Sequence, residues 1–187
     1  NYLDYIRLSS LELISNEIKT AGLSGAVAEL GVYKGKFARY INQYFSDRKL
    51  YLFDTFSGFD DKDIKTDASA GFSSGEQDFS KTSVEAVLAI LPHREQCVIK
   101  QGYFPETVSG IEEQFVFVSI DTDLYDPIYN GLCYFYPRLV KGGYIFVHDY
   151  NNDIYKGANK AVKQFCEEMK ISFFPLPDSG GSAIILK

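Results

Sequence analysis

The chain has 187 residues, enough for one domain with a single core, and carries 25 acidic against 19 basic residues, for a net charge of −6. This balance, without a dense basic run, disfavours nucleic acid and anionic membranes as partners and favours a neutral or cationic small molecule. The three cysteines are widely spaced in apolar runs, and no apolar segment has the length of a membrane span. We expect a single cytoplasmic domain over residues 1–187, and the sequence does not distinguish a monomer from a homo-oligomer.

Helical and strand patterns alternate along most of the chain. An apolar repeat at helical spacing predicts a first helix that Ser9-Ser10 caps and that ends near Gly22. Further helical patterns occupy residues 35–45, 83–91, 127–139 and 157–169, with a short helix near Pro105. Apolar runs predict strands over residues 26–30, 50–53, 97–100, 115–120, 144–147, 171–175 and 183–186.

Residues 57–80 interrupt this alternation. The segment is rich in Gly, Ser and Asp, and Phe59, Phe72 and Phe79 are scattered through it. A loop of this length inside a compact domain is typical of an active-site lid. We expect a lid loop that excludes water and contacts the ligand, with a solvated insertion as the alternative for its middle.

The order of these elements predicts the fold class. Five strand-helix units with nearly continuous apolar strands indicate a parallel sheet that is covered on both faces. The last two strands flank the turn Asp178-Ser179-Gly180-Gly181 and must form an antiparallel hairpin. We therefore predict a Rossmann-like α/β fold with a doubly wound, mostly parallel seven-stranded sheet and a reversed C-terminal strand. Ligands of such sheets bind beyond the carboxyl ends of the strands.

The turn after the first strand has the features of a nucleotide-binding turn. The strand ends in Glu29, and the chain passes through Gly31 and Gly35 into a helix. Glycines let a ligand touch the backbone, and the helix N-terminus presents unpaired N–H groups. The spacing resembles the first motif of S-adenosylmethionine (SAM) methyltransferases and lacks the middle glycine of nicotinamide-binding turns. As the alternative, Glu29 accepts N–H bonds within its own turn.

Three further residues fit the same ligand. Asp54 follows the glycine turn by roughly twenty residues, where an acid accepts hydrogen bonds from ribose hydroxyls. Its alternative role is to cap the strand end. Tyr33 lies over the methionine part of a bound SAM or is a packing aromatic. Gly102 follows the third strand and reaches the same crevice.

Asp121, His148 and Asp149 form a second constellation. They follow two strands that should be neighbours, so their side chains should lie close together. Two carboxylates without a counter-ion repel, and the group therefore suits a divalent cation or a positively charged ligand. As the alternative, Asp121 binds the ammonium group of the cofactor while His148 and Asp149 cap the following loop.

Several ordered blocks of sequence resemble the macrocin O-methyltransferase family, a family of class I SAM-dependent methyltransferases that act on sugar hydroxyls of macrolides and related natural products. The blocks are Ala28-Glu29-Leu30-Gly31-Val32-Tyr33-Lys34-Gly35, residues 48–59, Gly102-Tyr103-Phe104-Pro105-Glu106-Thr107, Asp121-Thr122-Asp123-Leu124-Tyr125 and residues 136–144. The resemblance implies SAM contacts at Glu29, Gly31, Tyr33, Gly35 and Asp54, joined by Gly102 and Asp121. It implies a magnesium site at Asp121, His148 and Asp149.

The resemblance implies a SAM-dependent O-methyltransferase that acts on a sugar hydroxyl with the help of a divalent metal. Asp121 and Asp149 then hold the cation, and His148 or a metal-bound water takes the proton. The family has two acids where this chain has His148-Asp149, and an imidazole suits softer ions than Mg²⁺. Metal-independent methyl transfer, a non-catalytic SAM-binding module and, less favoured, a nicotinamide-dependent oxidoreductase are the alternatives.

Overall fold

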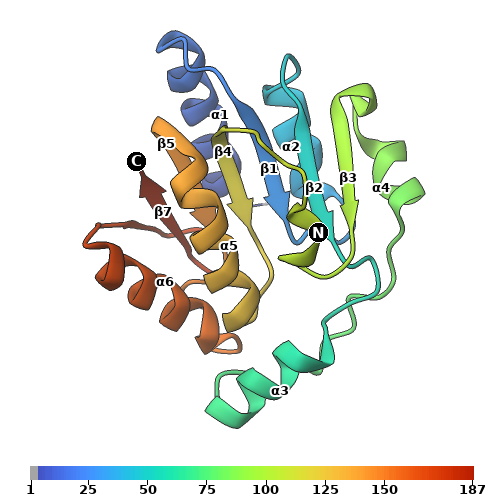
Figure 1. Cartoon of the computed structure of the whole chain (residues 1–187), viewed down its shortest axis with the longest axis vertical. Helices are drawn as coiled ribbons and strands as arrows, with labels where there is room; N and C mark the ends of the chain where they lie inside the picture. The colour runs from blue at the N-terminus through green and yellow to red at the C-terminus, as the bar shows by residue number, and fades with distance from the viewer. Residues whose placement is uncertain (1–3) are drawn as a thin grey trace.

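The computed structural model describes residues 4–187, and seven strands in it form one sheet in the order β3-β2-β1-β4-β5-β7-β6 (Figure 1). The strands from β1 to β5 pair in parallel, whereas β7 runs antiparallel to both β5 and β6. The strands are β1 Ala26–Leu30, β2 Leu50–Asp54, β3 Cys97–Gln101, β4 Phe115–Ile120, β5 Leu139–Val147, β6 Phe174–Leu176 and β7 Ser182–Leu186. The predicted reversed C-terminal strand is confirmed.

Burial explains why the central strands are continuous apolar runs. Every residue of β1 and of β4 is buried, because helices cover both faces of the sheet there. The bounds predicted for these two strands agree with the structure. In contrast, β5 begins five residues earlier than the predicted residue 144, since Leu139 already pairs with Phe115 of β4.

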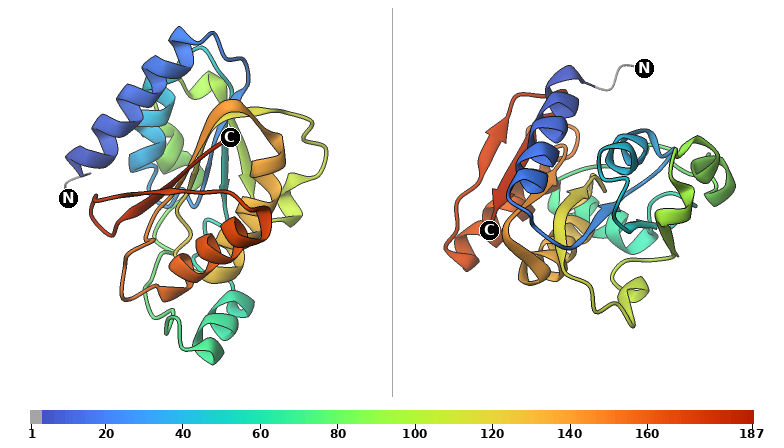
Figure 2. Two further views of the ribbon diagram at one scale, coloured as in Figure 1. Left: turned by 90° about the vertical axis from the view of Figure 1, so that its left-hand side faces the viewer. Right: turned by 90° about the horizontal axis from the view of Figure 1, so that it is seen from above.

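Helices form a layer on each face of the sheet (Figure 2). One layer contains α1 Tyr5–Thr20, α2 Lys36–Tyr44 and α4 Val84–Ile90. The other contains α5 Tyr125–Arg138 and α6 Lys156–Met169. Two short 3₁₀ helices, η1 Arg94–Gln96 and η2 Glu106–Val108, flank β3. Across residues 4–187, no helix is both long and apolar enough to cross a membrane.

The start of the first helix differs from the prediction. Asp4, not the serine pair, is the N-cap of α1, and its carboxylate accepts a 2.7 Å hydrogen bond from the backbone N–H of Ile6. Ser9 lies one turn into the helix, where its hydroxyl donates to the carbonyl of Ile6. Because α1 begins at Tyr5, it includes Arg7, which the predicted boundary left outside.

The segment predicted as a lid loop contains a helix. α3 spans Asp61–Ala70 and begins at the N-cap Asp60, whose carboxylate accepts from the N–H of Lys62. The helix lies beyond the carboxyl ends of the parallel strands (Figure 1), where it contacts the N-terminal end of α5. The expectation of a loop over residues 57–80 is therefore wrong for its middle, and the role of this segment as a lid stays a prediction.

Candidate active site

A cavity of about 350 Å³ lies at the carboxyl ends of the parallel strands, within the size range of small-molecule sites. The predicted site residues that line it are Glu29, Gly31, Tyr33, Asp54, Gly102, Asp121, His148 and Asp149. Gly35 does not line it. Gly35 is the N-cap of α2 with φ +70°, and a Cβ added there would lie 2.9 Å from Val87 of α4. Its missing side chain therefore allows the two helices to pack closely.

Gly31 directly follows β1 and lies against the residue that follows β4, Asp121. Its φ is +88°, and an added Cβ would lie 2.1 Å from the carbonyl oxygen of Asp121. Only glycine fits this conformation and this space. The glycine turn is therefore held directly against the backbone of the acid that follows β4.

Asp54 holds the glycine turn from the neighbouring strand. Its Oδ2 accepts hydrogen bonds from the N–H groups of Val32 (2.7 Å) and Tyr33 (2.8 Å), and its Oδ1 accepts from Phe56 (2.6 Å). Each carboxylate oxygen can accept more than one bond, so these contacts leave acceptor capacity for a ligand. Asp54 thus orders the turn whether or not it also binds a ribose.

Glu29 is a buried acid with an unused oxygen. Its side chain is 1 % exposed, and within residues 4–187 its Oε2 has no hydrogen-bond partner. Burial raises the pKa of Glu29 well above its ordinary value, and attraction to Arg7 offsets only part of this effect. A buried acceptor without a partner is costly, so Glu29 fits a ligand that brings a hydrogen-bond donor into the cavity.

Arg7 is a cavity residue that the predicted site set did not include. The residue is 4 % exposed, and its side chain stacks on Phe37 with the guanidinium carbon 3.9 Å from the ring centre. The guanidinium donates to Asp121 Oδ2 at 3.0 Å and to Ser119 Oγ at 3.3 Å. The first helix thereby places a permanent positive charge beside the acids of the site.

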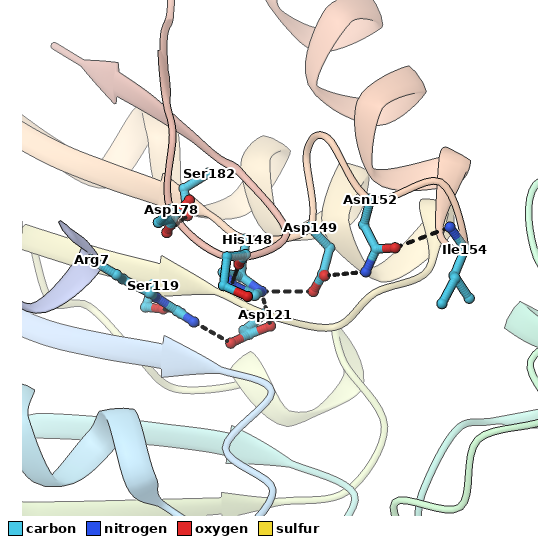
Figure 3. A network of polar contacts seen from close by, with 10 residues as sticks. Arg7, Ser119, Asp121, His148, Asp149, Asn152, Ile154, Asp178 and Ser182 are labelled. Atoms are coloured by element: carbon cyan, nitrogen blue, oxygen red, sulfur yellow. Dashed lines mark hydrogen bonds and ion pairs between the residues drawn. The ribbon is translucent and has the colours of Figure 1, made fainter. Parts of the chain in front are cut away.

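His148 lies between two carboxylates and a carbonyl (Figure 3). Its Nδ1 is 2.7 Å from Asp149 Oδ2 and 3.2 Å from Asp121 Oδ1, and its Nε2 is 2.9 Å from the carbonyl oxygen of Ser179. Burial alone would lower the pKa of His148, but attraction to Asp121 and hydrogen bonds to both acids raise it to about 10. Burial would also raise the pKa of Asp121, yet His148 and Arg7 hold it well below its ordinary value.

Asp123 is a second cavity residue that the predicted site set did not include. Burial, followed by repulsion from Asp149 and Asp121, raises the pKa of Asp123 well above its ordinary value. Its φ of +62° is uncommon for a residue other than glycine. The Asp-x-Asp spacing after a buried strand was the available sequence signal, but spacing alone does not reveal which of the two acids pairs with cations.

The donor set of Asp121, His148 and Asp149 fits a divalent cation. One ligand atom from each lies within 4.8 Å of the others. The contact of Nε2 with Ser179 leaves Nδ1 facing the acids, which is how metal-binding histidines are usually oriented. Without a cation, Arg7 and a protonated His148 supply the positive charge that faces the carboxylates of Asp121 and Asp149.

The two ends of the lid segment meet over the glycine turn. Phe79 contacts Tyr33 edge-on at 5.0 Å between ring centres and contacts Phe59 at the same distance. Phe59, Phe79 and Tyr33 all line the cavity. Phe72 instead packs on Tyr125, at 5.7 Å, and does not line the cavity. The predicted lid thus supplies two of its three phenylalanines to the cavity.

Solved structures of methyltransferases share this fold. The O-methyltransferase NovP aligns over 97% of this chain and 79% of its own, with a TM-score of 0.78 and 22% identity. The calicheamicin methyltransferase CalS11 aligns over 96% and 78%, with a TM-score of 0.75 and 21% identity. The apo structure of CalS11, described as a TDP-rhamnose 3'-O-methyltransferase, aligns over 96% and 78%, with a TM-score of 0.64 and 18% identity. At these identities the likeness shows the fold alone.

A search of curated protein sequences found no match. The sequence model of the family described as macrocin-O-methyltransferase matches residues 4–177, which include every residue of the cavity discussed above. The match covers both the glycine turn and the acids that follow β4 and β5. The chain therefore belongs to the macrocin O-methyltransferase family and is a SAM-dependent O-methyltransferase.

Proposed function

We propose that this enzyme methylates a hydroxyl group of a sugar, in a natural product or a glycan, and that a divalent cation assists the reaction. The main observation in support of the proposal is that the residues around the glycine turn and the acids that follow β4 and β5 line one cavity. The glycine turn with Glu29 and Asp54 lines the same cavity as the acids Asp121, Asp123 and Asp149. A methyl donor and a polar acceptor can therefore lie side by side, as direct transfer requires.

The family and one solved relative support a sugar acceptor. The family takes its name from a macrocin O-methyltransferase, and CalS11 is described as a TDP-rhamnose 3'-O-methyltransferase. The cavity agrees with a polyhydroxylated acceptor, because carboxylates accept hydrogen bonds from hydroxyl groups. Phe59 and Phe79 supply an apolar surface from the lid segment on which a sugar ring or an attached aglycone can pack.

The residues around the glycine turn are suited to the methyl donor. When bound, SAM supplies a methyl group on a positively charged sulfur. The unpartnered oxygen of Glu29 accepts a hydrogen bond from SAM. Asp54 orders the glycine turn and also accepts hydrogen bonds from the ribose hydroxyls of SAM. Tyr33 and Gly102 complete the lining on this side of the cavity.

Asp123 is a better candidate than His148 for the group that takes the proton of the acceptor hydroxyl. Both ring nitrogens of His148 already face oxygen atoms, and its pKa of about 10 keeps it protonated near neutral pH. Asp123 lines the cavity, and its raised pKa brings it closer to the range in which a carboxylate is an effective general base.

A cation at this site would be held by Asp121, His148 and Asp149, and His148 would bind it through Nδ1 only after losing the proton that this nitrogen directs at the two acids. When bound, such an ion polarises an acceptor oxygen and lowers the pKa of its proton. Asp149 is suited to this role because Asn152 also donates to its Oδ1 at 2.7 Å, which fixes the carboxylate. The pairing of Arg7 with Asp121 favours the alternative of metal-independent transfer, because it already supplies positive charge there.

The test is a screen of nucleotide-linked sugars and natural-product glycosides with methyl-labelled SAM, run with and without a chelator. Catechols serve as the comparison class of acceptor. Label on a sugar supports the proposal, and loss of transfer after chelation, with recovery on adding Mg²⁺ or Mn²⁺, supports the metal. Label on catechols alone would overturn the sugar acceptor, and undiminished transfer in the chelator would overturn the metal.

A further inference from the structure

The lid helix α3 docks on the protein through acidic side chains. Asp63 and Asp67 lie one turn apart on one face of the helix and are its buried residues, at 5 % and 0 % exposed. Asp63 accepts a 2.8 Å hydrogen bond from the hydroxyl of Tyr103, which lines the cavity beside Gly102. Hydrogen bonds have a preferred direction, so a helix that docks through carboxylates has a more closely defined position than one that docks by apolar packing.

Asp67 takes the place of a capping residue for α5. The residue at the N-cap position of α5 is Leu124, whose apolar side chain cannot accept a hydrogen bond. Asp67, 58 residues earlier in the sequence, accepts from the N–H of Tyr125 at 3.0 Å. The first turn of α5 is therefore capped by the lid helix and not by its own sequence.

The second oxygen of Asp67 faces the first turn of α6. A Cβ added to Gly157 would lie 2.8 Å from Asp67 Oδ2 and 2.9 Å from the backbone nitrogen of Tyr125. The carboxylate of Asp67 thus lies where the N-terminal ends of α5 and α6 converge, and both ends carry partial positive charge. Burial raises the pKa of Asp67 to about 6, while the N–H of Tyr125 acts in the opposite direction.

Both of these helices directly follow the acidic loops of the active site. The loop with Asp121 and Asp123 leads into α5, and the segment that begins at His148 and Asp149 leads into α6. Asp123 and Asp149 have φ angles of +62° and +57°. Such conformations persist only where the surrounding structure holds them.

We propose that Asp67 is a positioning residue for methyl transfer. By capping α5 and contacting the start of α6, it fixes the two loops that carry the acids only when the lid helix is docked. The lid then does more than exclude water: its docking completes the arrangement of Asp121, Asp123 and Asp149. This inference rests on the proposed role of those acids in the reaction.

The test compares Asp67→Ala with Asp67→Asn and with Asp61→Ala, which removes an exposed acid from the same helix. We expect Asp67→Ala to lower kcat about 10- to 100-fold, because the acids of the two loops are then misplaced relative to the acceptor. The affinity for S-adenosylhomocysteine should change less than about threefold, since the glycine turn is not affected. Asp67→Asn retains an acceptor for Tyr125 and should recover most of the rate. Asp61→Ala should resemble the wild type.

Hydrogen exchange provides a readout that does not depend on the acceptor. With S-adenosylhomocysteine bound, Asp67→Ala should accelerate exchange over residues 121–126, and Asp61→Ala should not. If exchange there is unchanged in Asp67→Ala, the positioning role is overturned even when sugar methylation is confirmed. Accelerated exchange in an enzyme that methylates no sugar would uphold the capping of the loop and overturn only the proposed acceptor.

Gly157→Ala tests the same contact from the opposite side and keeps Asp67 intact. Alanine has the higher helix propensity, so the change should not weaken α6 itself. Its Cβ would lie 2.8 Å from the Asp67 carboxylate and 2.9 Å from the backbone nitrogen of Tyr125, so it must disturb the capping contact between them, and we expect the same loss of kcat and the same faster exchange over residues 121–126. Wild-type kcat and exchange in Gly157→Ala would contradict the inference, also in the case that Asp67→Ala does not fold.

Discussion

Arg7 and Asp121 are separated by 114 residues in the sequence and form a 3.0 Å ion pair inside the active site. The guanidinium also stacks on Phe37 of α2, so it joins the first two helices to the end of β4. α1 is therefore part of the active site as well as a cover for one face of the sheet. The pair stabilises the charged form of an acid that would otherwise be repelled by its neighbours.

Replacing Arg7 with alanine should destabilise the fold. The change leaves Asp121 with His148 as its remaining cationic contact and opens space beside Phe37. Breaking a buried ion pair by removing one partner typically costs about 3 kcal/mol or more. Urea unfolding of Arg7→Ala measures this loss, and Arg94→Ala, which removes an exposed arginine, is the control. A difference of less than about 0.5 kcal/mol between the two variants would show that the pair is not important for stability.

Gly31 should tolerate no side chain. In Gly31→Ala the new Cβ would lie 2.1 Å from a backbone oxygen of Asp121, so the ends of β1 and β4 must separate. Gly110→Ala is a matched control, because Gly110 also has a positive φ but has nothing within 4 Å of an added Cβ. We expect the control to lose about 1 kcal/mol from backbone strain alone. Gly31→Ala should lose several times more and should not bind S-adenosylhomocysteine by calorimetry; equal losses would refute the close-approach argument.

Asp123→Asn should separate chemistry from cofactor binding. The amide cannot take a proton, and removal of a general base typically costs about 100-fold or more in kcat. Because Asp123 acts in its unprotonated form and its pKa is raised, the wild-type rate should increase with pH through that pKa. The variant should lose this part of the pH profile and keep its affinity for S-adenosylhomocysteine. A variant that retains the wild-type kcat would remove Asp123 from the mechanism.

The strands could be predicted because burial on both faces makes them continuous apolar runs. β1 and β4 are buried along their full length, and their predicted bounds agree with the structure. Edge elements carry less of this signal: β6 has exposed residues and begins three positions later than predicted. The glycine turn and the strand-end acids could likewise be found, because the topology brings the carboxyl ends of parallel strands to one edge.

α3 and Arg7 could not be predicted by the same reasoning. The periodicity argument looks for an apolar stripe, and the buried face of α3 consists of Asp63 and Asp67. A sequence pattern with acids at these positions predicts a loop, because nothing local shows that the acids are buried. The groups that donate hydrogen bonds to Asp63 and Asp67 belong to Tyr103 and Tyr125, which are distant in the sequence. Arg7 is similar, since its partner Asp121 is fixed only by the tertiary structure.

His148→Asp should change the preference of the site among divalent cations. The family has two acids at this position of the chain, and an all-oxygen donor set suits Mg²⁺ better than one with an imidazole nitrogen. We expect the wild type to bind Mn²⁺ more tightly than Mg²⁺. In His148→Asp, the ratio of the dissociation constants for Mg²⁺ and Mn²⁺ should fall by about tenfold or more. Calorimetry with each metal alone measures this without an acceptor. Asp121→Ala, which removes one metal-binding carboxylate, should bind neither ion. If the wild type and His148→Asp show the same ratio of Mg²⁺ to Mn²⁺ affinity, the imidazole is not a metal ligand.

Docking of the lid helix should strengthen as the pH falls. Burial raises the pKa of both Asp63 and Asp67 to about 6, against an ordinary value of 3.8, so the docked state binds protons more tightly than the undocked state. Repulsion from Asp126 adds to both shifts. Lowering the pH from about 6 toward 3.8 must therefore favour docking. At higher pH the contribution of the two carboxyl groups to the free energy of docking is constant. Hydrogen exchange over residues 61–70, corrected for intrinsic rates, should show more protection at about pH 5.5 than at about pH 7.5. Asp63→Asn retains an acceptor for Tyr103 and removes one titrating group, so the change in protection between these two pH values should be roughly halved. Protection that increases with pH would contradict the burial of these carboxylates.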